Sequence, residues 1–538
     1  MSASFAFRPQ RRWMAAVSAA VILLATFVAV SASSLVRVVV TSTSDRAARA
    51  AVERAGGVVD SDLPIVDGVV ARVPSDRVAE LSTFTTVVSN RALHVRSAAF
   101  EGQPSTAFPY EVGATDMWQS TAGDGVGVAL VDTGVAPVPD LLDRVVAVAD
   151  LTPEHRFTDT FGHGTFMAGL IAGNGTASDG RYTGVAPGAH LVSIKVATAD
   201  GSTTLATVLE GLQLVERSRE HFNIRVMLLA LSSDSDLSPE RDPLTRALRK
   251  LWDHGVFVVV PAGNNGPDAG SVDLPGSDPV LMTVGAVDDL GTPSVDDDVV
   301  PSWTGRGPTS FGDAKPDAAA PGTHLVSLRA PGSTVDRDNP SARVGELYFR
   351  GSGTSMSAAV TAGVAALVLA ARPDFSSDEL KQALVSGATP LDGADPSALG
   401  AGVVNAVDAT DEVTGDGHGH RGHRGGHGSS GSSNGWDSRI WNARVWDGRV
   451  WNGRVWNGRV WDSRVWDSRV WDARIWDSRV WDSRVWDSRV WDSRVWDGRT
   501  WNSRVWDSRV WDSQNGRIWD SRVWESRSGR IWDSRVWG

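Results

Sequence analysis

Cysteine is absent from this chain of 538 residues. Without a disulfide framework, stability must come from a hydrophobic core, from bound ions or from assembly. Beyond the first 34 residues we identify no segment that is apolar enough to span a membrane. The length is sufficient for two or three domains and for a catalytic core of ordinary size.

The chain also lacks a basic patch outside its C-terminal tail. The net charge is -12, but residues 436–538 contain 20 Arg against 15 Asp and Glu. The tail therefore carries +5, and the remainder carries about -17. Proteins that bind nucleic acids concentrate lysine and arginine on one face. This distribution argues against a nucleic-acid partner.

Residues 1–34 have the pattern of a signal peptide. Three arginines between positions 8 and 12 precede an apolar run and then small residues, which predicts export and cleavage near Ala32. An uncleaved membrane anchor is the alternative, because the apolar run is at the short edge of what spans a bilayer. The pair Arg11 and Arg12 leaves twin-arginine export open beside the general secretory route. We expect a secreted or cell-surface associated protein.

Residues 35–97 read as a small α+β unit. The strand-like LVRVVV and VDGVVARV alternate with the helix-like DRAARAAVERAGG and SDRVAELS, and VVSNRALHV is a candidate last strand. About sixty residues bury little surface, so the unit gains stability by docking on something larger. Its place directly after the signal predicts a removable prosegment, with residues 98–112 as the maturation linker.

Residues 113–409 follow a different pattern. Apolar runs that favour β-strands alternate with helical stretches, and the runs are GVGVALV, AHLVSIKV, IRVMLLAL, GVFVVVPA and VLMTVGAV. Continuous hydrophobicity indicates strands that are buried on both faces. The predicted fold class is therefore α/β, with a parallel β-sheet between helices. In such sheets binding sites form at the carboxyl ends of the strands.

Polar residues at these strand ends and at two helix starts are the candidate site. Asp132 follows the first run in VDTG, and Asn264 follows the fourth. His163 lies between two glycines at the start of an apolar helix, and Ser355 begins another, where free N–H groups favour negative charge. Asp-Thr-Gly also marks aspartic proteases, but those need a second such motif and none occurs here.

Taken together, an acid, a base and a hydroxyl each lie on a glycine-flanked turn, in the order Asp, His, Ser. The motifs VDTGV, GHGTFMAG, PAGNNG and GTSMSAA resemble those of the subtilases, the subtilisin-like serine peptidases. The resemblance covers about 300 residues. Residues 35–97 resemble the inhibitory prosegment of that family more loosely.

The resemblance implies a role for each catalytic residue. Ser355 would attack the peptide carbonyl, His163 would transfer the proton, and Asp132 would orient the imidazole. The amide of Asn264, with the Ser355 N–H, would hold the oxyanion. The implied substrates are proteins or peptides, and the implied intramolecular inhibitor is the chain's own prosegment.

The resemblance also implies substrate-binding positions, which are Leu231, Ser232, Ala262 and Gly263. No metal ligand is predicted and no cofactor is required, although calcium is left open near residues 173–184. Some positions depart from the family. Ala-Leu-Ser at 230–232 replaces Ser-Leu-Gly, which leaves the P1 preference open, and Phe166 replaces the second His of His-Gly-Thr-His.

A second function class stays open beside the endopeptidase. The protein would then be a structural or adhesive surface protein. Its protease-like domain would be inert, and its tail would carry the function. The complete set of four catalytic residues favours the enzyme.

Residues 410–435 form a linker rich in glycine, serine and histidine. Such composition is typical of a flexible spacer, while its four histidines are candidate metal ligands. These histidines are His418, His420, His423 and His427.

Residues 436–538 repeat a five-residue unit of the type Trp-Asp-Ser-Arg-Val. On an α-helix this period advances about 140° per unit and makes no apolar stripe, and on a strand it sends successive Trp to opposite faces. Two structures are left: a solenoid with one short strand and one turn per unit, and a disordered chain. The Asp-Ser and Asn-Gly turns favour the solenoid. Trp and Arg can stack on sugars and attract anions. A cell-wall polymer is therefore one candidate partner of the tail, and self-association is the other.

Overall fold

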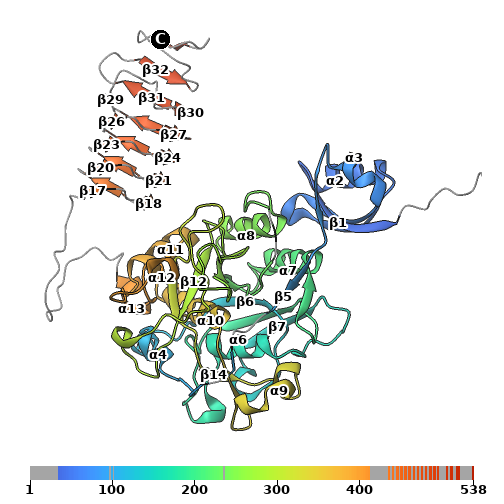
Figure 1. Cartoon of the computed structure of the whole chain (residues 1–538), viewed down its shortest axis with the longest axis vertical. Coiled ribbons are helices and arrows are strands. Elements are labelled where there is room, and N and C mark those ends of the chain that lie inside the picture. Colours follow the sequence, from blue (N-terminus) through green and yellow to red (C-terminus); the bar gives the residue numbers. More distant parts are fainter. Residues whose placement is uncertain are drawn as a thin grey trace, which may run out of the picture. The chain divides into compact units, whose positions relative to one another are not determined.

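The computed structural model describes residues 34–95, 99–100, 102–233, 235 and 237–411, together with short strands between residues 434 and 537 (Figure 1). The chain divides into two compact units, Met1–Gly415 and Asp416–Gly538. The predicted signal peptide lies outside the described residues, apart from Ser34, and so do the four histidines of the linker.

The first sheet is antiparallel, with the strand order β2-β3-β1-β4. Its strands are β1 (Leu35–Thr41), β2 (Val58–Leu63), β3 (Gly68–Pro74) and β4 (Thr86–Ser89). Helix α2 (Asp45–Arg54) packs on it and begins at the capping residue Ser44, whose side chain accepts the N–H of Ala47. The short helix α3 (Val78–Leu81) precedes β4.

Both faces of this sheet are covered. Successive side chains along a strand point to opposite faces, so alternate valines pack into two different clusters. Val38 and Val40 cluster with residues of α2 such as Val52. Val39 and Val70 instead belong to the large core of residues 113–409. The predicted prosegment therefore shares a hydrophobic core with the domain that follows it.

The central sheet has seven parallel strands in the order β13-β12-β11-β10-β6-β8-β7. They are β6 (Gly127–Asp132), β7 (Val145–Asp150), β8 (His190–Lys195), β10 (Ile224–Leu228), β11 (Phe257–Pro261), β12 (Met282–Val287) and β13 (Ala318–Pro321). All five strands expected from apolar runs are present. The predicted α/β domain with a parallel sheet is confirmed.

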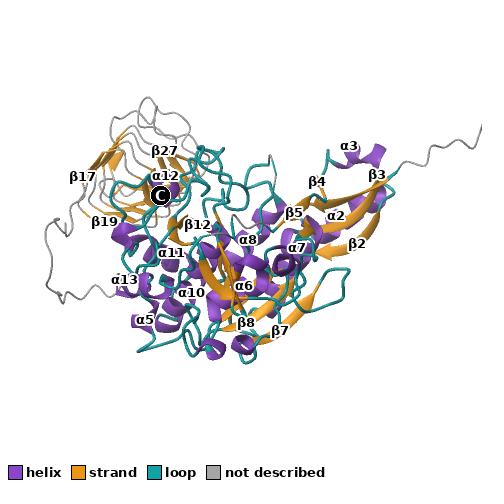
Figure 2. Ribbon diagram, turned by 60° about the horizontal axis from the view of Figure 1, so that its bottom comes forward, coloured by secondary structure: helices purple, strands orange, loops and turns teal. Residues whose placement is uncertain are grey.

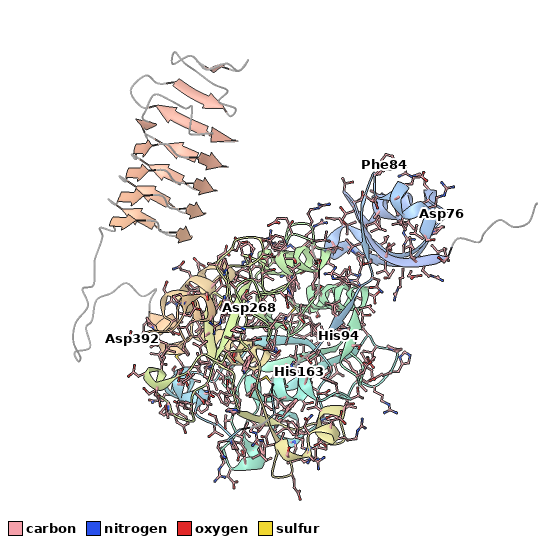
Figure 3. The ribbon with its side chains drawn as sticks, viewed as in Figure 1. Asp76, Phe84, His94, His163, Asp268 and Asp392 are labelled. Carbon is pink, nitrogen blue, oxygen red and sulfur yellow. The ribbon has the colours of Figure 1, made fainter. Side chains whose placement is uncertain are left out.

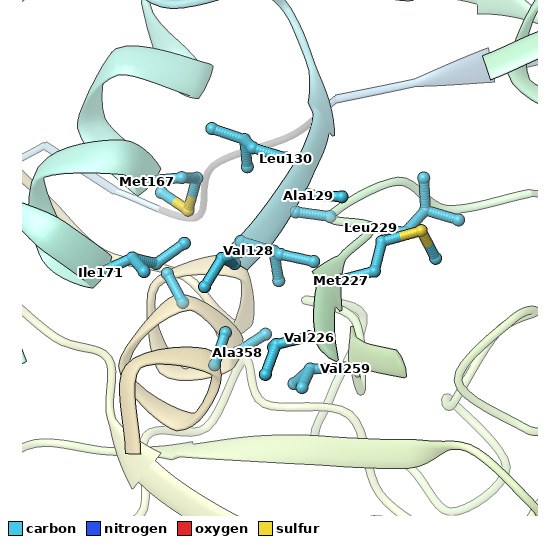
Figure 4. Close-up of a cluster of buried hydrophobic side chains, with 14 of the residues drawn as sticks. Val128, Ala129, Leu130, Met167, Ile171, Val226, Met227, Leu229, Val259 and Ala358 are labelled. Atoms are coloured by element: carbon cyan, nitrogen blue, oxygen red, sulfur yellow. The ribbon is translucent and has the colours of Figure 1, made fainter. Parts of the chain in front are cut away.

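Helices cover the sheet on both faces (Figure 2). Helix α6 (His163–Ala172) packs against α10 (Thr354–Ala371), while α7 (Leu205–Ser218) packs against α8 (Pro243–Asp253). Figure 4 shows the core between β6, α6 and α10, where Val128, Met167 and Ala358 gather.

Within the described residues one helix, α10, has the length and apolar composition of a membrane span, and 89% of it is buried inside the protein. The prediction that no segment beyond residue 34 has this composition is therefore wrong. The helix contacts β10, β11 and β12 and is apolar on all sides because the domain surrounds it.

Smaller elements complete the first unit. A second small sheet has the order β14-β16-β15, and the predicted strand at 87–95 divides into β4 and β5, with β5 paired to β9. These strands are β5 (Ala92–His94), β9 (Ser202–Thr204), β14 (Leu325–Leu328), β15 (Arg343–Val344) and β16 (Tyr348–Gly351). The remaining helices are α4 (Phe108–Glu111), α5 (Ala114–Met117), α9 (Thr334–Asp338), α11 (Ser377–Ser386), α12 (Pro396–Leu399) and α13 (Ala406–Asp411). The 3-10 turns are η1 (Pro64–Val66), η2 (Ser75–Arg77), η3 (Pro139–Leu141), η4 (Thr176–Ser178), η5 (Val295–Asp297) and η6 (Pro340–Ala342).

The second unit consists of short strands in three sheets (Figure 1). Each strand that begins between residues 434 and 479 pairs in parallel with the strand three units, or fifteen residues, later, as Arg449 pairs with Arg464 and Trp451 with Trp466. The strands that begin at residues 484 and 489 pair in parallel with strands twenty residues later, as Arg489 pairs with Arg509. The last three strands are joined to one another by antiparallel pairing. The strands are β17 (Asn434–Trp436), β18 (Arg439–Trp441), β19 (Arg444–Trp446), β20 (Arg449–Trp451), β21 (Arg454–Trp456), β22 (Arg459–Trp461), β23 (Arg464–Trp466), β24 (Arg469–Trp471), β25 (Arg474–Trp476), β26 (Arg479–Trp481), β27 (Arg484–Trp486), β28 (Arg489–Trp491), β29 (Arg494–Val495), β30 (Val505–Trp506), β31 (Arg509–Asp512), β32 (Arg517–Asp520) and β33 (Val536–Trp537).

Candidate active site

Asp132 is the last residue of β6, near the middle of the central sheet, and it is fully buried. Its Oδ1 accepts the N–H of Thr133 at 2.7 Å. Gly134 follows with φ +98°, a conformation that favours glycine. A Cβ on Gly164 would collide with the Gly134 carbonyl oxygen. Glycine at position 164 thus allows β6 and α6 to approach closely.

His163 is the first residue of α6 and follows Gly162, which has φ +115°. Its Nδ1 lies 2.9 Å from both carboxylate oxygens of Asp132. Its Nε2 is buried and has no hydrogen-bond partner among the described residues. A carboxylate bonded to Nδ1 favours the tautomer with Nε2 as acceptor, so Nε2 can take a proton from a third group.

Asp159 supports this pair, and sequence reasoning missed it. Its carboxylate accepts the hydroxyl of Thr133 at 2.8 Å, the N–H of Gly162 at 2.6 Å, and both the N–H and the hydroxyl of Thr165 at 2.8 and 2.6 Å. Burial raises the pKa of Asp159, and these donors oppose that rise. The carboxylate thereby ties the residue after Asp132 to the first turn of α6.

Ser355 is the second residue of α10 and is buried. Thr354 directly precedes it, and Gly353 precedes Thr354. Gly353 has φ +154°, a conformation that glycine adopts readily. The free N–H groups of the first helical turn surround this position. The neighbouring Met356 lines one cavity together with His163. The packing of α6 against α10 and this shared cavity thus place the first turns of the two helices near each other.

Asn264 lies beyond the end of β11 and is oriented by Thr354. Its Oδ1 accepts the N–H and the hydroxyl of Thr354, both at 3.0 Å. Thr354 Oγ1 in turn accepts the N–H of Gly263 at 3.1 Å. Because the amide oxygen is already engaged, Nδ2 is the atom of Asn264 that can donate to a ligand beside Ser355.

Of the predicted substrate-binding positions, Ser232 contacts the end of the N-terminal segment. Strand β5 pairs antiparallel with β9, and His94 also forms a bridge to Ser232. Leu231 and Ala262 are buried. Ala99 pairs with Ser352, three residues before Ser355. Figure 3 labels His94 and His163.

A family model described as "Subtilase family" matches residues 123–408, which is more than half of the chain. The chain belongs to the subtilase family. The matched range contains all four predicted catalytic residues of this subtilase, which are Asp132, His163, Asn264 and Ser355.

Curated relatives of this subtilase are proteases. Serine protease AprX of Bacillus subtilis (strain 168) is 42% identical over 294 residues, which is 54% of this chain and 66% of that protein. Thermostable alkaline protease of Halalkalibacterium halodurans is 32% identical over 54% of this chain and 68% of its own length. Subtilisin Savinase of Lederbergia lenta is 33% identical over 54% of this chain and 91% of its own length. These relatives do not favour the inert-domain alternative.

Among solved structures, fervidolysin from Fervidobacterium pennivorans, a keratinolytic enzyme related to subtilisin, superposes with a TM-score of 0.55. The match covers 71% of this chain and 62% of that chain at 23% identity. At this identity the superposition shows a shared fold only.

The open question of calcium concerns residues 173–184. In this subtilase Asp140 holds that loop, since its Oδ1 accepts the N–H of Ala177 and its Oδ2 accepts the hydroxyl of Tyr348 at 2.7 Å. Subtilases need no cofactor for catalysis, and many of them bind calcium. The described residues include no group of three or more His, Asp or Glu side chains that could hold a metal ion.

Proposed function

We propose that this subtilase is a secreted serine endopeptidase that hydrolyses peptide bonds through an acyl-enzyme. One observation carries the proposal. In the buried Asp132–His163 pair, Nε2 has no partner among the described residues, and His163 lines a cavity together with Met356, the residue after Ser355. This supports an acid, a base and a nucleophile that come from segments far apart in the sequence.

The proposed reaction follows from this geometry. Ser355 Oγ attacks the substrate carbonyl while His163 Nε2 accepts its proton and then returns it to the leaving amine. Asp132 keeps Nδ1 as the donor and stabilises the imidazolium. The Nδ2 of Asn264 and the Ser355 N–H donate to the oxyanion at the positive end of α10. Water then attacks the acyl-enzyme, and His163 activates that water.

We further propose that residues 35–97 are an inhibitory prosegment that the enzyme removes itself. The support is the position of β5, which adds a strand to β9 while His94 pairs with Ser232. Val95 N–H also donates to the Gly201 carbonyl at 3.1 Å. The described chain resumes at Ala99. Ala99 pairs with Ser352, which lies three residues before Ser355 in the sequence. The proposed cleavage is at a bond between Val95 and Ala99, because the described residues on its two sides pair with Ser232 and Ser352.

A fluorophosphonate probe tests both proposals, because it reacts with an activated serine. The processed protein is expected to be labelled at Ser355 and to cleave casein. Ser355→Ala is expected to abolish both and to accumulate as the unprocessed chain in a host that lacks other proteases. Ser357→Ala, which changes the next serine on α10, should keep labelling. Processed protein that neither labels nor cleaves casein would refute the enzyme, and normal trimming of Ser355→Ala would refute self-processing.

For residues 436–538 we propose a three-sided solenoid that holds the enzyme at the cell surface. The support is the pairing of the strands between residues 434 and 481 with strands three units later, which makes fifteen residues one coil in this range. In this register identical residues lie side by side in columns, including columns of Arg and columns of Trp. Such columns suit an anionic polymer or a sugar chain.

A further inference from the structure

Lys195 is a fully buried lysine at the end of β8. In the central sheet it pairs directly with Asp132 of β6. Residues paired in this way project from the same face of a sheet, because successive side chains along a strand alternate between the faces. The buried ammonium group and the carboxylate that bonds His163 therefore lie on one face of the sheet.

The ammonium group of Lys195 makes three hydrogen bonds. Its Nζ donates to Glu154 Oε2 at 2.7 Å, to the Thr160 hydroxyl at 2.8 Å and to the Thr158 carbonyl at 3.0 Å. The Thr160 hydroxyl donates in turn to Glu154 Oε2 at 2.7 Å. All three acceptors belong to the segment between β7 and α6, so the lysine fixes that segment to the sheet.

Residues 151–161, which we name the histidine loop, end two residues before His163. Asp159 belongs to this loop, and its carboxylate accepts hydrogen bonds from the start of α6. Thr160 follows Asp159 and is held by the ammonium group of Lys195. A displacement of Thr160 would therefore move Asp159, and Asp159 in turn would shift the first turn of α6 with His163.

Glu154 connects this network to a second segment. Its Oε1 accepts the N–H of Ala199 at 2.6 Å, and Ala199 lies three residues before β9. Burial acts to raise the pKa of Glu154, but the hydrogen bonds from Lys195, Thr160 and Ala199 outweigh burial, so the pKa lies below its ordinary value. Glu154 is therefore ionised at neutral pH and neutralises the buried ammonium group.

Other charged groups approach His163 from the elements around α6, and each has its own partner. Asp132 bonds the imidazole itself. Arg329 and Asp336 line one cavity with His163 and bond each other at 2.9 Å. Asp140 on η3, which contacts α6, accepts an N–H and a hydroxyl. Helix α10 contains no charged residue.

We propose that the buried Lys195–Glu154 ion pair is a positioning device for the catalytic base: it fixes the histidine loop, and its two charges cancel in the surroundings of the imidazole. This inference rests on the proposed peptidase function. Both are positioning residues, because they act through Asp159 and His163 and not on the substrate. Removing one charge leaves the other uncompensated at a buried site, where charges interact strongly. An uncompensated positive charge opposes the imidazolium form of His163, and an uncompensated negative charge favours it.

The rate at which a fluorophosphonate labels Ser355 tests this proposal across pH, because labelling requires unprotonated His163. Glu154→Gln keeps the shape of the side chain and leaves Lys195 its two other acceptors. The midpoint of the acid limb should therefore move lower, by about 0.3 to 1 pH unit. Lys195→Met should move the midpoint higher by a similar amount, because Glu154 is partly exposed and stays ionised.

The double variant Lys195→Met with Glu154→Gln separates charge from position. Both charges are then absent, so the midpoint should return to the parent value. The histidine loop has lost its ion pair, however, and labelling at the optimal pH should be about tenfold to a hundredfold slower than in the parent. A residue that only stabilises the fold would not produce opposite shifts that cancel in the double variant.

Lys315 provides the matched control. It is also buried, and its Nζ lies 2.6 Å from Asp317, but it lies three residues before β13, at the opposite edge of the central sheet. Lys315→Met should lower the Tm and leave the midpoint and the optimal labelling rate near the parent values.

The outcomes distinguish this inference from the proposed function. Midpoints that stay unchanged, or that move in the same direction, in Glu154→Gln and Lys195→Met variants that digest casein would overturn the positioning role. The midpoint of Glu154→Gln alone decides if Lys195→Met does not mature. A parent enzyme that neither labels nor digests casein would instead overturn the proposed function.

Discussion

Glu111 and Asp298 are two buried carboxyl groups that face each other. Neither receives a hydrogen bond from a donor group among the described residues. Burial, reinforced by the charges of Asp298 and Asp289, raises the pKa of Glu111 to about 10. Burial also raises the pKa of Asp298 to about 7. Glu111 therefore keeps its proton at neutral pH and can donate it to Asp298.

This pair predicts a loss of stability in alkali. The folded chain binds a proton at Glu111 that the unfolded chain releases near its ordinary pKa, so the free energy of unfolding falls as pH rises from about 4.5 to about 10. Glu111→Gln should flatten this dependence, because an amide donates to Asp298 at every pH. The measurement is the Tm between pH 6 and 10 in the Ser355→Ala background, with the exposed Glu80→Gln as control. Parallel Tm curves for Glu111→Gln and its parent would contradict the assignment.

Asn264 carries a prediction about catalysis. Asn264→Ala should lower kcat by about a hundredfold to a thousandfold and leave KM nearly unchanged, because the oxyanion forms only after attack. The adjacent Asn265 bonds Asp273 at 2.6 Å and provides the matched control, since Asn265→Ala should leave kcat near the parent value. Steady-state kinetics on one peptide compares the two. An equal loss for both variants would show a general effect on this loop.

Some site residues were readable from the sequence because glycines mark them. Gly134 lies two residues after Asp132, Gly162 directly precedes His163, and both glycines have positive φ. Such a tight turn leaves a recognisable pattern in the sequence. Asp159 has no such mark. An acidic residue in a loop is common, and the donors from Thr133, Gly162 and Thr165 converge on it only in the fold. Its position four residues before His163 was the one available signal.

At the scale of elements, hydrophobicity found the strands that are buried on both faces and missed those at the edges. Strand β7 alternates between partly buried and exposed residues, and Val146 and Val148 are exposed. The small sheet of β14, β15 and β16 has strands of two to four residues, too short for a periodic pattern. Its pairing with Ala99 and Ser105 involves contacts far apart in the sequence.

The docking of β5 predicts a strong effect of one arginine. Arg91 Nη2 lies 2.6 Å from Asp242, which is fully buried, and Arg91 Nε donates to Ser233. Arg91→Ala would leave that carboxylate without its cation. We expect the separately supplied segment 35–97 to inhibit the processed enzyme at least tenfold more weakly with this change. Arg77→Ala removes an exposed pair with Glu80 and should leave the inhibition constant unchanged. Equal inhibition constants for all three segments would remove Arg91 from the interface.

At the scale of the whole molecule, the tail differs in charge from the rest of the chain. The sequence predicted strand-forming units, but a five-residue period alone does not reveal which units pair. The described register, in which most partners are three units apart, depends on how many units complete one coil. That number follows from the turn between strands and not from the hydrophobic pattern.

The basic tail predicts salt-dependent attachment. The full-length Ser355→Ala protein should sediment with purified cell wall at low salt and be released as salt rises, because salt screens attraction between exposed charges. A chain that ends at residue 411 should stay in solution under the same conditions. Equal sedimentation of both proteins, or none, would remove the anchoring role. Sedimentation of the full-length protein without wall would favour self-association.

The shared core of the first sheet has a consequence for the lifetime of the enzyme. Val39, Val70 and Val88 pack into the same core as the catalytic domain, so the domain folds with a surface already covered. Under the proposed removal of that segment, the same surface would have to form without it, and refolding would meet a higher barrier than the first folding. The processed enzyme would then persist because it unfolds slowly. Its durability is a rate, set by the height of the unfolding barrier, and a molecule that does unfold is lost.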